Sequence, residues 1–386
     1  MACRVQDKPF AGIFEVLSEQ GFAGMREAAE KLLNEVAKLE RAAWLGAEPY
    51  ERSEARRGYA NGFKPKTVKS RLGALALEVP QTRDGGFYPT SLEKGLRSER
   101  ALKLALAEMY VKGVSTRKMA AVTEQLCGLS VNSTEVSRAA AALDETLEAW
   151  RNRPLGRFAY VFLDARYEKV REAGEVRDMA VLVAIGVNAR GRREILGVSA
   201  ALSEAEVHWR EFLSGLAERG LKGLRLIVSD AHEGLKAARR AVWPGVAWQR
   251  CQFHLQQNAQ AYVPRQGMKR EVAAAIHAIF NAPDEPEARR LLEAFLKRYA
   301  QSAPKLVAWA ETALPEGFTV FAFPEAHRRR LRTSNICERV NKEIRRRTRV
   351  ATLFPNEASC LRLASAVAME ISEEWVTGRA YLDLTQ

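Results

Sequence analysis

The sequence has no long apolar run and no internal repeat. No stretch approaches the about 18 consecutive apolar residues that a membrane-spanning helix needs. The N-terminal stretch MACRVQDKPFAGIFEVLSEQ contains Asp7 and Glu15 and lacks the apolar block of a signal peptide. These absences predict a cytoplasmic protein without a membrane partner.

Cysteine is scarce and scattered. The chain has five cysteines and no closely spaced pair of them. They are Cys3, Cys127, Cys251, Cys337 and Cys360. An odd and dispersed set is typical of reduced thiols in a cytosol-like compartment, so no disulfide framework is expected.

Acidic residues are the minority charge. The 386-residue chain has 60 Lys and Arg against 47 Asp and Glu, which gives a net charge of +13. Apolar residues make up 47% and charged residues 28%, a globular composition at a length that allows two or three domains. The positive excess indicates a polyanionic partner, nucleic acid before membrane, because no basic amphipathic anchor is present.

The first half of the chain contains two helical regions separated by a basic segment. Helical periodicity is clear in residues 10–50. In the segment RRGYANGFKPKTVKSRLGALALEVPQTRDGGFYP, apolar residues alternate as on a short half-buried strand. Its cations interleave with Tyr59 and Phe63. This pattern suits a surface that follows a nucleic-acid backbone, and a solvated loop fits it as well.

The second helical region, residues 99–150, breaks at two glycines. The breaks fall at Gly113 and Gly128, and the candidate caps after them are Ser115 or Thr116 and Asn132 or Ser133. This spacing fits a helix-turn-helix whose recognition helix begins at residues 134–138, with Arg117 and Arg138 as DNA contacts. A plain helical hairpin remains the alternative.

From residue 155 the pattern becomes α/β. The predicted strands are FAYVFLDA, MAVLVAIGVN, EILGVSA, LRLIVSD and VAWQRCQF. The stretches EAEVHWREFLSGLAERG and AHEGLKAARRAV predict helices, and residues 255–313 read almost wholly as helix. Two further helices are expected at 334–348 and 356–376.

Two aspartates end predicted strands, Asp164 in YVFLDARYEKV and Asp230 in RLIVSDAHEGL. The carboxyl end of a strand is where α/β sheets place functional groups. Each has a structural alternative. Asp230 and Glu233 have capping-box spacing for a helix from Ala231, and Asp164 suits a turn cap.

A third acid, Glu338, lies in TSNICERVNKEIRRRTRV. Asn335 and Glu338 also have capping-box spacing. An apolar stripe of Ile336, Val340 and Ile344 places Glu338 on the other side of the helix. The order strand–Asp, strand–Asp, helix–Glu matches a ribonuclease-H-like core, in which three carboxylates hold two divalent ions. Oxygen ligands of this kind suit Mg²⁺.

The acid at position 338 lies within a strongly basic segment. Residues 328–349 contain ten Arg or Lys and two Glu. Arginine binds phosphate through paired hydrogen bonds, so this segment predicts contact with a DNA backbone. The expected phosphate-binding residues are Arg332, Arg339, Lys342, Arg345 and Arg346.

Several motifs resemble the bacterial Mutator-type insertion-sequence transposases. They are LDARYEKVRE, IVSDAHEGLKAA, WQRCQFHLQQNAQAYVP and LRTSNICERVNKEIRRRTRVATLFPNEASCLRL, and the resemblance runs from about residue 45 to the C-terminus. It implies a DDE transposase with a ribonuclease-H-like α/β core that is interrupted by a helical insertion and preceded by helical DNA-binding modules. The catalytic acids would be Asp164, Asp230 and Glu338. Glu343, the nearest rival to Glu338, does not follow the S-N-x-x-E pattern.

The resemblance also implies partners and cofactors. The expected cofactor is Mg²⁺, with Mn²⁺ as a substitute, as two ions held by the three acids. The expected partners are terminal inverted repeats, target DNA and further copies of the chain, at the bacterial nucleoid. Cys251 and His254 form a C-x-x-H element beside the active site. A structural zinc needs four ligands, and no second pair is available, so zinc is not expected.

These inferences divide the chain into six parts. They are an N-terminal helical region (1–56), a basic β segment (57–98), a helix-turn-helix region (99–152), the first catalytic part (153–254), a helical insertion (255–325) and the C-terminal catalytic part (326–386). The expected function is metal-dependent cleavage and transfer of DNA strands. The alternatives are a transposase-derived DNA-binding regulator without catalysis and a structure-specific nuclease on the same fold.

Overall fold

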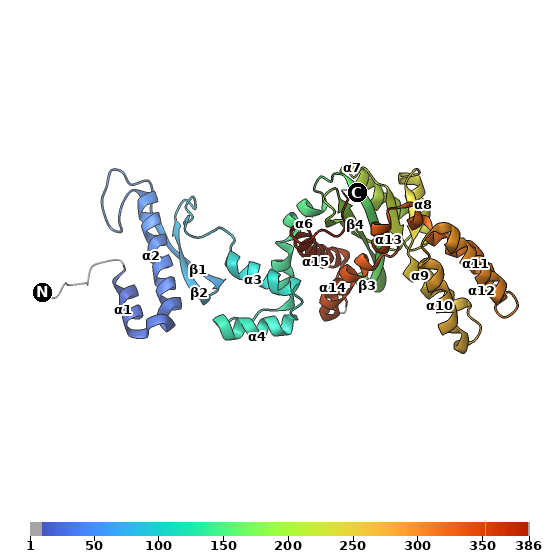
Figure 1. The fold of residues 1–386 in the computed structure, drawn as a ribbon. Coiled ribbons are helices and arrows are strands. Elements are labelled where there is room, and N and C mark those ends of the chain that lie inside the picture. Colours follow the sequence, from blue (N-terminus) through green and yellow to red (C-terminus); the bar gives the residue numbers. More distant parts are fainter. Residues whose placement is uncertain (1–9, 352, 385–386) are drawn as a thin grey trace. The chain divides into compact units, whose positions relative to one another are not determined.

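The computed structural model describes residues 10–351 and 353–384. The chain divides into two compact units, Met1–Leu143 and Asp144–Gln386 (Figure 1). Cys3 and the first nine residues of the predicted N-terminal helical region lie outside the described residues.

The first unit combines helices with a two-stranded sheet. Its elements are α1 (Ala11–Gln20), the 3₁₀ helix η1 (Gly21–Gly24), α2 (Met25–Leu45), β1 (Ala60–Ser70), β2 (Gly73–Thr82), α3 (Arg100–Val111), α4 (Thr116–Cys127) and α5 (Ser133–Ala141). β1 and β2 pair antiparallel. Leu75, Leu77 and Val79 of β2 are buried against Ala37 of α2, which confirms the predicted alternation.

The predicted breaks before α4 and α5 are confirmed. The Ser115 side chain accepts a hydrogen bond from the amide of Lys118 at the start of α4. Asn132 and Glu135 form a complete capping box at the start of α5. Gly128 ends α4 at φ 62°, a left-handed conformation that glycine adopts without strain.

The second unit is built on a mixed five-stranded sheet. Its strands are β3 (Phe158–Glu172), β4 (Glu175–Asn188), β5 (Arg193–Ala201), β6 (Leu226–Ser229) and β7 (Ala247–Arg250), in the order β5-β4-β3-β6-β7. β5, β4 and β3 are antiparallel neighbours, whereas β6 and β7 run parallel to β3. β3 continues well beyond the predicted FAYVFLDA because β4 pairs with it as far as Glu172, including polar residues that the apolar pattern does not mark.

Helices cover both faces of this sheet. α7 (Glu206–Glu218) and α8 (Glu233–Val242) bury Trp209, Leu213 and Leu235 against Val161 and Leu163 of β3. The alternate β3 residues contact the other layer, which contains α13 (Glu325–Leu331), α14 (Asn335–Ala351) and α15 (Glu357–Thr377). α6 (Asp144–Arg151) joins α15 through an ion pair of Arg362 with Asp144.

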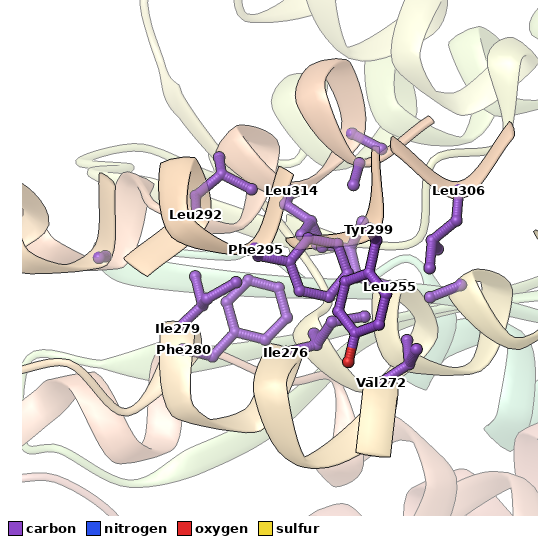
Figure 2. Close-up of a cluster of buried hydrophobic side chains, with 14 of the residues drawn as sticks. Leu255, Val272, Ile276, Ile279, Phe280, Leu292, Phe295, Tyr299, Leu306 and Leu314 are labelled. Atoms are coloured by element: carbon purple, nitrogen blue, oxygen red, sulfur yellow. The ribbon is translucent and has the colours of Figure 1, made fainter. Parts of the chain in front are cut away.

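A separate helical core lies between β7 and α13 in the sequence. Its elements are α9 (Gln252–Ala259), η2 (Gln260–Tyr262), η3 (Gln266–Met268), α10 (Lys269–Phe280), α11 (Glu285–Tyr299), α12 (Pro304–Ala313), η4 (Leu314–Gly317) and η5 (Thr319–Ala322). Figure 2 shows Ile276, Phe280 and Phe295 meeting between these helices. This core is distinct from the buried clusters on the sheet.

Among the described residues, no helix is long and apolar enough to cross a membrane.

Candidate active site

Asp164 and Asp230 occupy matching positions on neighbouring parallel strands. Phe162 of β3 pairs with Val228 of β6, and each chain reaches its aspartate two residues later. Adjacent strands lie about 4.8 Å apart and side chains alternate with a period of two. The register therefore brings both acids to one edge of the sheet, on the side of Phe162 and Val228.

The capping alternatives for these two acids are wrong. α8 begins at Glu233 after His232, so Asp230 precedes the helix and is not its N-cap. Asp230 instead accepts a hydrogen bond through Oδ1 from the amide of Ala231, at 2.7 Å. Asp164 lies inside the β3–β4 ladder opposite Val183, not in a turn.

α14 approaches Asp164 through Asn341. The Asn341 Nδ2 donates a hydrogen bond to Asp164 Oδ2 at 2.8 Å. Two residues along β3, the Arg166 guanidinium donates to the main-chain oxygen of Asn341. Arg166 also pairs with Glu168, which accepts a hydrogen bond from Thr348 Oγ1 at 3.2 Å. A polar ladder thus fixes α14 along one face of β3.

Glu338 lies one turn before Asn341 on α14. Residues three apart are neighbours on a helix surface, so Glu338 is on the side of α14 that carries Asn341. The predicted stripe is confirmed, since Ile336, Val340 and Ile344 are buried. α14 begins at Asn335, which makes Glu338 its fourth residue rather than the third, so the proposed capping box does not match this helix start.

The three predicted acids do not form a closed metal site. Glu338 is exposed. Within residues 10–351 and 353–384, no group of three or more His, Cys, Asp and Glu side chains is close enough to hold a metal ion. The register of β3 with β6 thus brings Asp164 and Asp230 to one sheet edge, and the role of Glu338 as the third acid stays a prediction.

Burial favours the protonated form of the Asp164 carboxyl. Burial raises the pKa of Asp164 to about 6, and the negative charges of Asp230 and Glu204 act in the same direction. His254 and the amide of Ala165 oppose the rise. Glu204, in the loop between β5 and α7, was not predicted, because nothing in its local sequence distinguishes it from an ordinary surface acid.

Cys251 and His254 lie beside these acids at the start of α9. Burial alone would raise the pKa of Cys251, but the hydrogen bond and charge of His254 lower it. The hydrogen bond with Cys251 outweighs burial and, with the charges of Asp230 and Asp164, raises the pKa of His254 to about 9. These interactions favour the protonated form of His254.

The pair of aspartates fits a divalent ion. Mg²⁺ takes oxygen ligands and often uses only one or two carboxylates together with substrate phosphates. A carboxylate whose pKa is raised by burial and by like charges gains stability when a cation approaches. Asp164 and Asp230 would hold such an ion. Cys251 and His254 are only two candidate ligands, whereas a structural zinc site needs four.

The predicted DNA-binding cations of α14 are exposed. Arg339, Lys342, Arg345 and Arg346 have exposed side chains. Arg332 is half-buried and donates to Asn281 Oδ1 at 2.6 Å. Two other members of the basic segment serve the fold, since Arg328 donates to main-chain oxygens and Arg347 is buried beside Glu370.

The predicted cations of the first unit lie on its helices α4 and α5. Arg117 follows the first residue of α4, and Arg138 lies in the last turn of α5. Both side chains are exposed. They are accessible to a partner, and their role in DNA binding stays a prediction.

A sequence model of the Mutator-family transposase domain matches residues 14–378, almost the entire chain. The chain belongs to the Mutator family of transposases. Its curated relatives include the transposase of insertion sequence IS406 from Burkholderia multivorans, which is 59% identical over 99% of each chain. The transposase of IS256 in transposon Tn4001 from Staphylococcus aureus is 36% identical over 91% of each chain. That of IS1081 from Mycobacterium tuberculosis is 39% identical over 89% of this chain and 83% of the relative.

One solved structure is similar in part: a simian T-cell lymphotropic virus intasome in complex with the PP2A regulatory subunit B56 gamma. The match covers 51% of this chain and 66% of the matched chain in that structure. The identity is 12% and the TM-score 0.18, so this likeness carries no statement about the fold. The resemblance of the sequence motifs to Mutator-type transposases is confirmed by the family and its relatives.

Proposed function

We propose that this protein is the transposase of a bacterial insertion sequence, and that it cleaves and joins DNA strands at Asp164, Asp230 and Glu338. Family membership and the named relatives support transposition as the function. The observation that carries the proposed site is the register of β3 and β6, which places Asp164 and Asp230 at one sheet edge.

The sheet also supports a ribonuclease-H-like catalytic core. Three antiparallel strands are followed by two parallel strands, and the first acid lies on the central strand β3. The helical block from α9 to α12 would be the insertion between the second and third acids. Residues 153–254 and 326–386 would then form the catalytic domain around the insertion at 255–325.

Asn341 supports Glu338 as the third acid, because it holds the next turn of α14 against Asp164. A change in the conformation of the exposed Glu338 side chain would bring its carboxylate toward the aspartates. Two Mg²⁺ ions, or Mn²⁺ in their place, would supply activation of a water or 3′-hydroxyl and stabilisation of the leaving oxygen. The protein's part is to orient the carboxylates and to hold the phosphate.

DNA would contact both units. The exposed cations of α14 would hold backbone phosphates next to the acids, and α4 and α5 with Arg117 and Arg138 would bind the terminal inverted repeats. The segment 57–98 would add backbone contacts. Joining requires two element ends, so we expect a homo-oligomer to assemble on DNA.

The test is joining of labelled terminal-repeat DNA to a plasmid in the presence of Mg²⁺. We expect Asp164→Asn and Glu338→Gln to bind the DNA and to join none of it. Glu343→Gln is the matched control, because it removes the other carboxylate of α14. If Glu338→Gln joins DNA at the wild-type rate, Glu338 is not the third catalytic acid. Wild-type protein that binds but never joins would favour the regulator.

A further inference from the structure

Asn341 makes the side-chain contact between the acid-bearing helix and the first acid. Its Nδ2 donates to Asp164 Oδ2 at 2.8 Å, and its main-chain oxygen accepts from Arg166. Its Oδ1 is buried and has no hydrogen-bond partner among the described residues. The amide is therefore only half satisfied, at a site where a buried polar atom without a partner costs about 1–3 kcal/mol.

Attachment of α14 to the sheet does not require this amide. Ile336, Val340 and Ile344 are 6%, 0% and 0% exposed, so an apolar stripe already packs the helix. Thr348, two turns further along α14, supplies another polar bond to β3 through Glu168. An apolar residue at position 341 would avoid the cost of the unsatisfied Oδ1. The presence of Asn therefore indicates a role other than packing.

We propose that Asn341 is a positioning residue that orients the Asp164 carboxylate for a divalent cation. A donor fixed on Oδ2 restricts rotation of the carboxylate and leaves Oδ1 of Asp164 for the ion. Groups that hold a metal ligand in this way usually change metal affinity by about 10- to 100-fold when they are replaced. Because Glu338 lies one turn from Asn341, the same contact fixes the spacing between the first and third acids.

This inference rests on the proposed metal-dependent function, so its test measures metal binding directly. Mn²⁺ alone is titrated into the full chain, and the bound ion is followed by calorimetry and by loss of the free-ion electron paramagnetic resonance signal. The variant is Asn341→Leu, which keeps the size and the helix and removes the donor.

Thr348→Val is the matched control. It removes one hydrogen bond between α14 and β3 with little change of shape, and it does not touch Asp164. Unfolding of both variants is measured by urea denaturation. A packing role for Asn341 would make the two variants behave alike in Mn²⁺ binding.

We expect Asn341→Leu to weaken Mn²⁺ binding about 10-fold or more, while Thr348→Val binds as the wild type does. Asp164→Asn serves as the reference and should abolish binding at this site. If Asp164→Asn loses the ion and Asn341→Leu keeps wild-type affinity, the inference about Asn341 is overturned and the proposed function stands. If wild-type protein binds Mn²⁺ no better than Asp164→Asn, the inference about Asn341 is overturned, and the joining assay decides the proposed function separately.

Discussion

The main-chain amide of Ser334 donates a hydrogen bond to the Sγ of Cys251 at 3.3 Å. A second bond joins the same segments, from the amide of Gln252 to the main-chain oxygen of Arg332 at 2.9 Å. Cys251 is fully buried, and Ser334 immediately precedes α14. The C-x-x-H element therefore ties the start of α9 to the start of the helix that carries Glu338.

Replacing Cys251 by alanine should destabilise the second unit more than replacing Cys360. Both thiols are buried, so the loss of packing is similar. Cys251→Ala also leaves the Ser334 amide without its acceptor, which should add about 1–2 kcal/mol to the loss of unfolding free energy. Urea denaturation of the two variants measures the difference. Equal losses would show that the Ser334–Cys251 bond contributes nothing to stability.

The raised pKa of Asp164 predicts a pH-dependent effect of Asp164→Asn. Because the folded-state pKa is about 6 and the ordinary value is 3.8, the folded chain holds this proton more tightly than the unfolded chain. Asp164 therefore lowers the unfolding free energy as pH rises from about 4 to about 6. Without metal, the unfolding free energy of Asp164→Asn should exceed that of the wild type by about 1–3 kcal/mol at pH 7.5, and the two should be equal near pH 4. Thermal melts across this range, with chelator present, test it, and an equal difference at both ends would contradict it.

The exposed cations of α14 should act through charge rather than base recognition. Lys342→Gln with Arg345→Gln should weaken binding to repeat and non-repeat DNA by similar factors. The slope of log affinity against log salt should fall by about 1 for each lost phosphate contact. Arg290→Gln on α11 is the control, since that exposed side chain pairs with Glu287. Fluorescence anisotropy across a salt series gives the slopes, and an unchanged slope in the double variant would remove α14 from the DNA interface.

Gly234 should tolerate no side chain. A methyl group there would collide with the main-chain oxygen of Glu204 and the amide of Glu206, where the loop after β5 packs against the start of α8. Gly234→Ala should therefore displace this loop, whose Glu204 lies near Asp164, and lower both melting temperature and strand joining.

Gly215→Ala is the control for Gly234. A methyl group on Gly215, in α7, meets no atom within 4 Å, and alanine is the better helix former by about 1 kcal/mol. It should leave the melting temperature equal or higher. A stable and fully active Gly234→Ala would mean that this loop does not support the site.

Much of the architecture is predictable because it depends on local pattern. Caps at Ser115 and Asn132 mark α4 and α5, and the apolar runs before Asp164 and Asp230 mark β3 and β6. Polar residues that are paired in a ladder leave no such mark. For that reason the sequence pattern did not predict that β3 extends to Glu172.

The candidate site divides in the same way. The sequence by itself determined the family, the two strand-end aspartates and the basic helix with its buried stripe, because each depends on residue type and spacing along one segment. Only the tertiary structure decided that Asp230 is no helix cap, that Glu204 lies near Asp164, that Asn341 bonds to Asp164, and that Cys251 bonds to the residue before α14. Those relationships join residues that are distant in the chain, and the register of β3 with β6 and the packing of α14 on the sheet determine them.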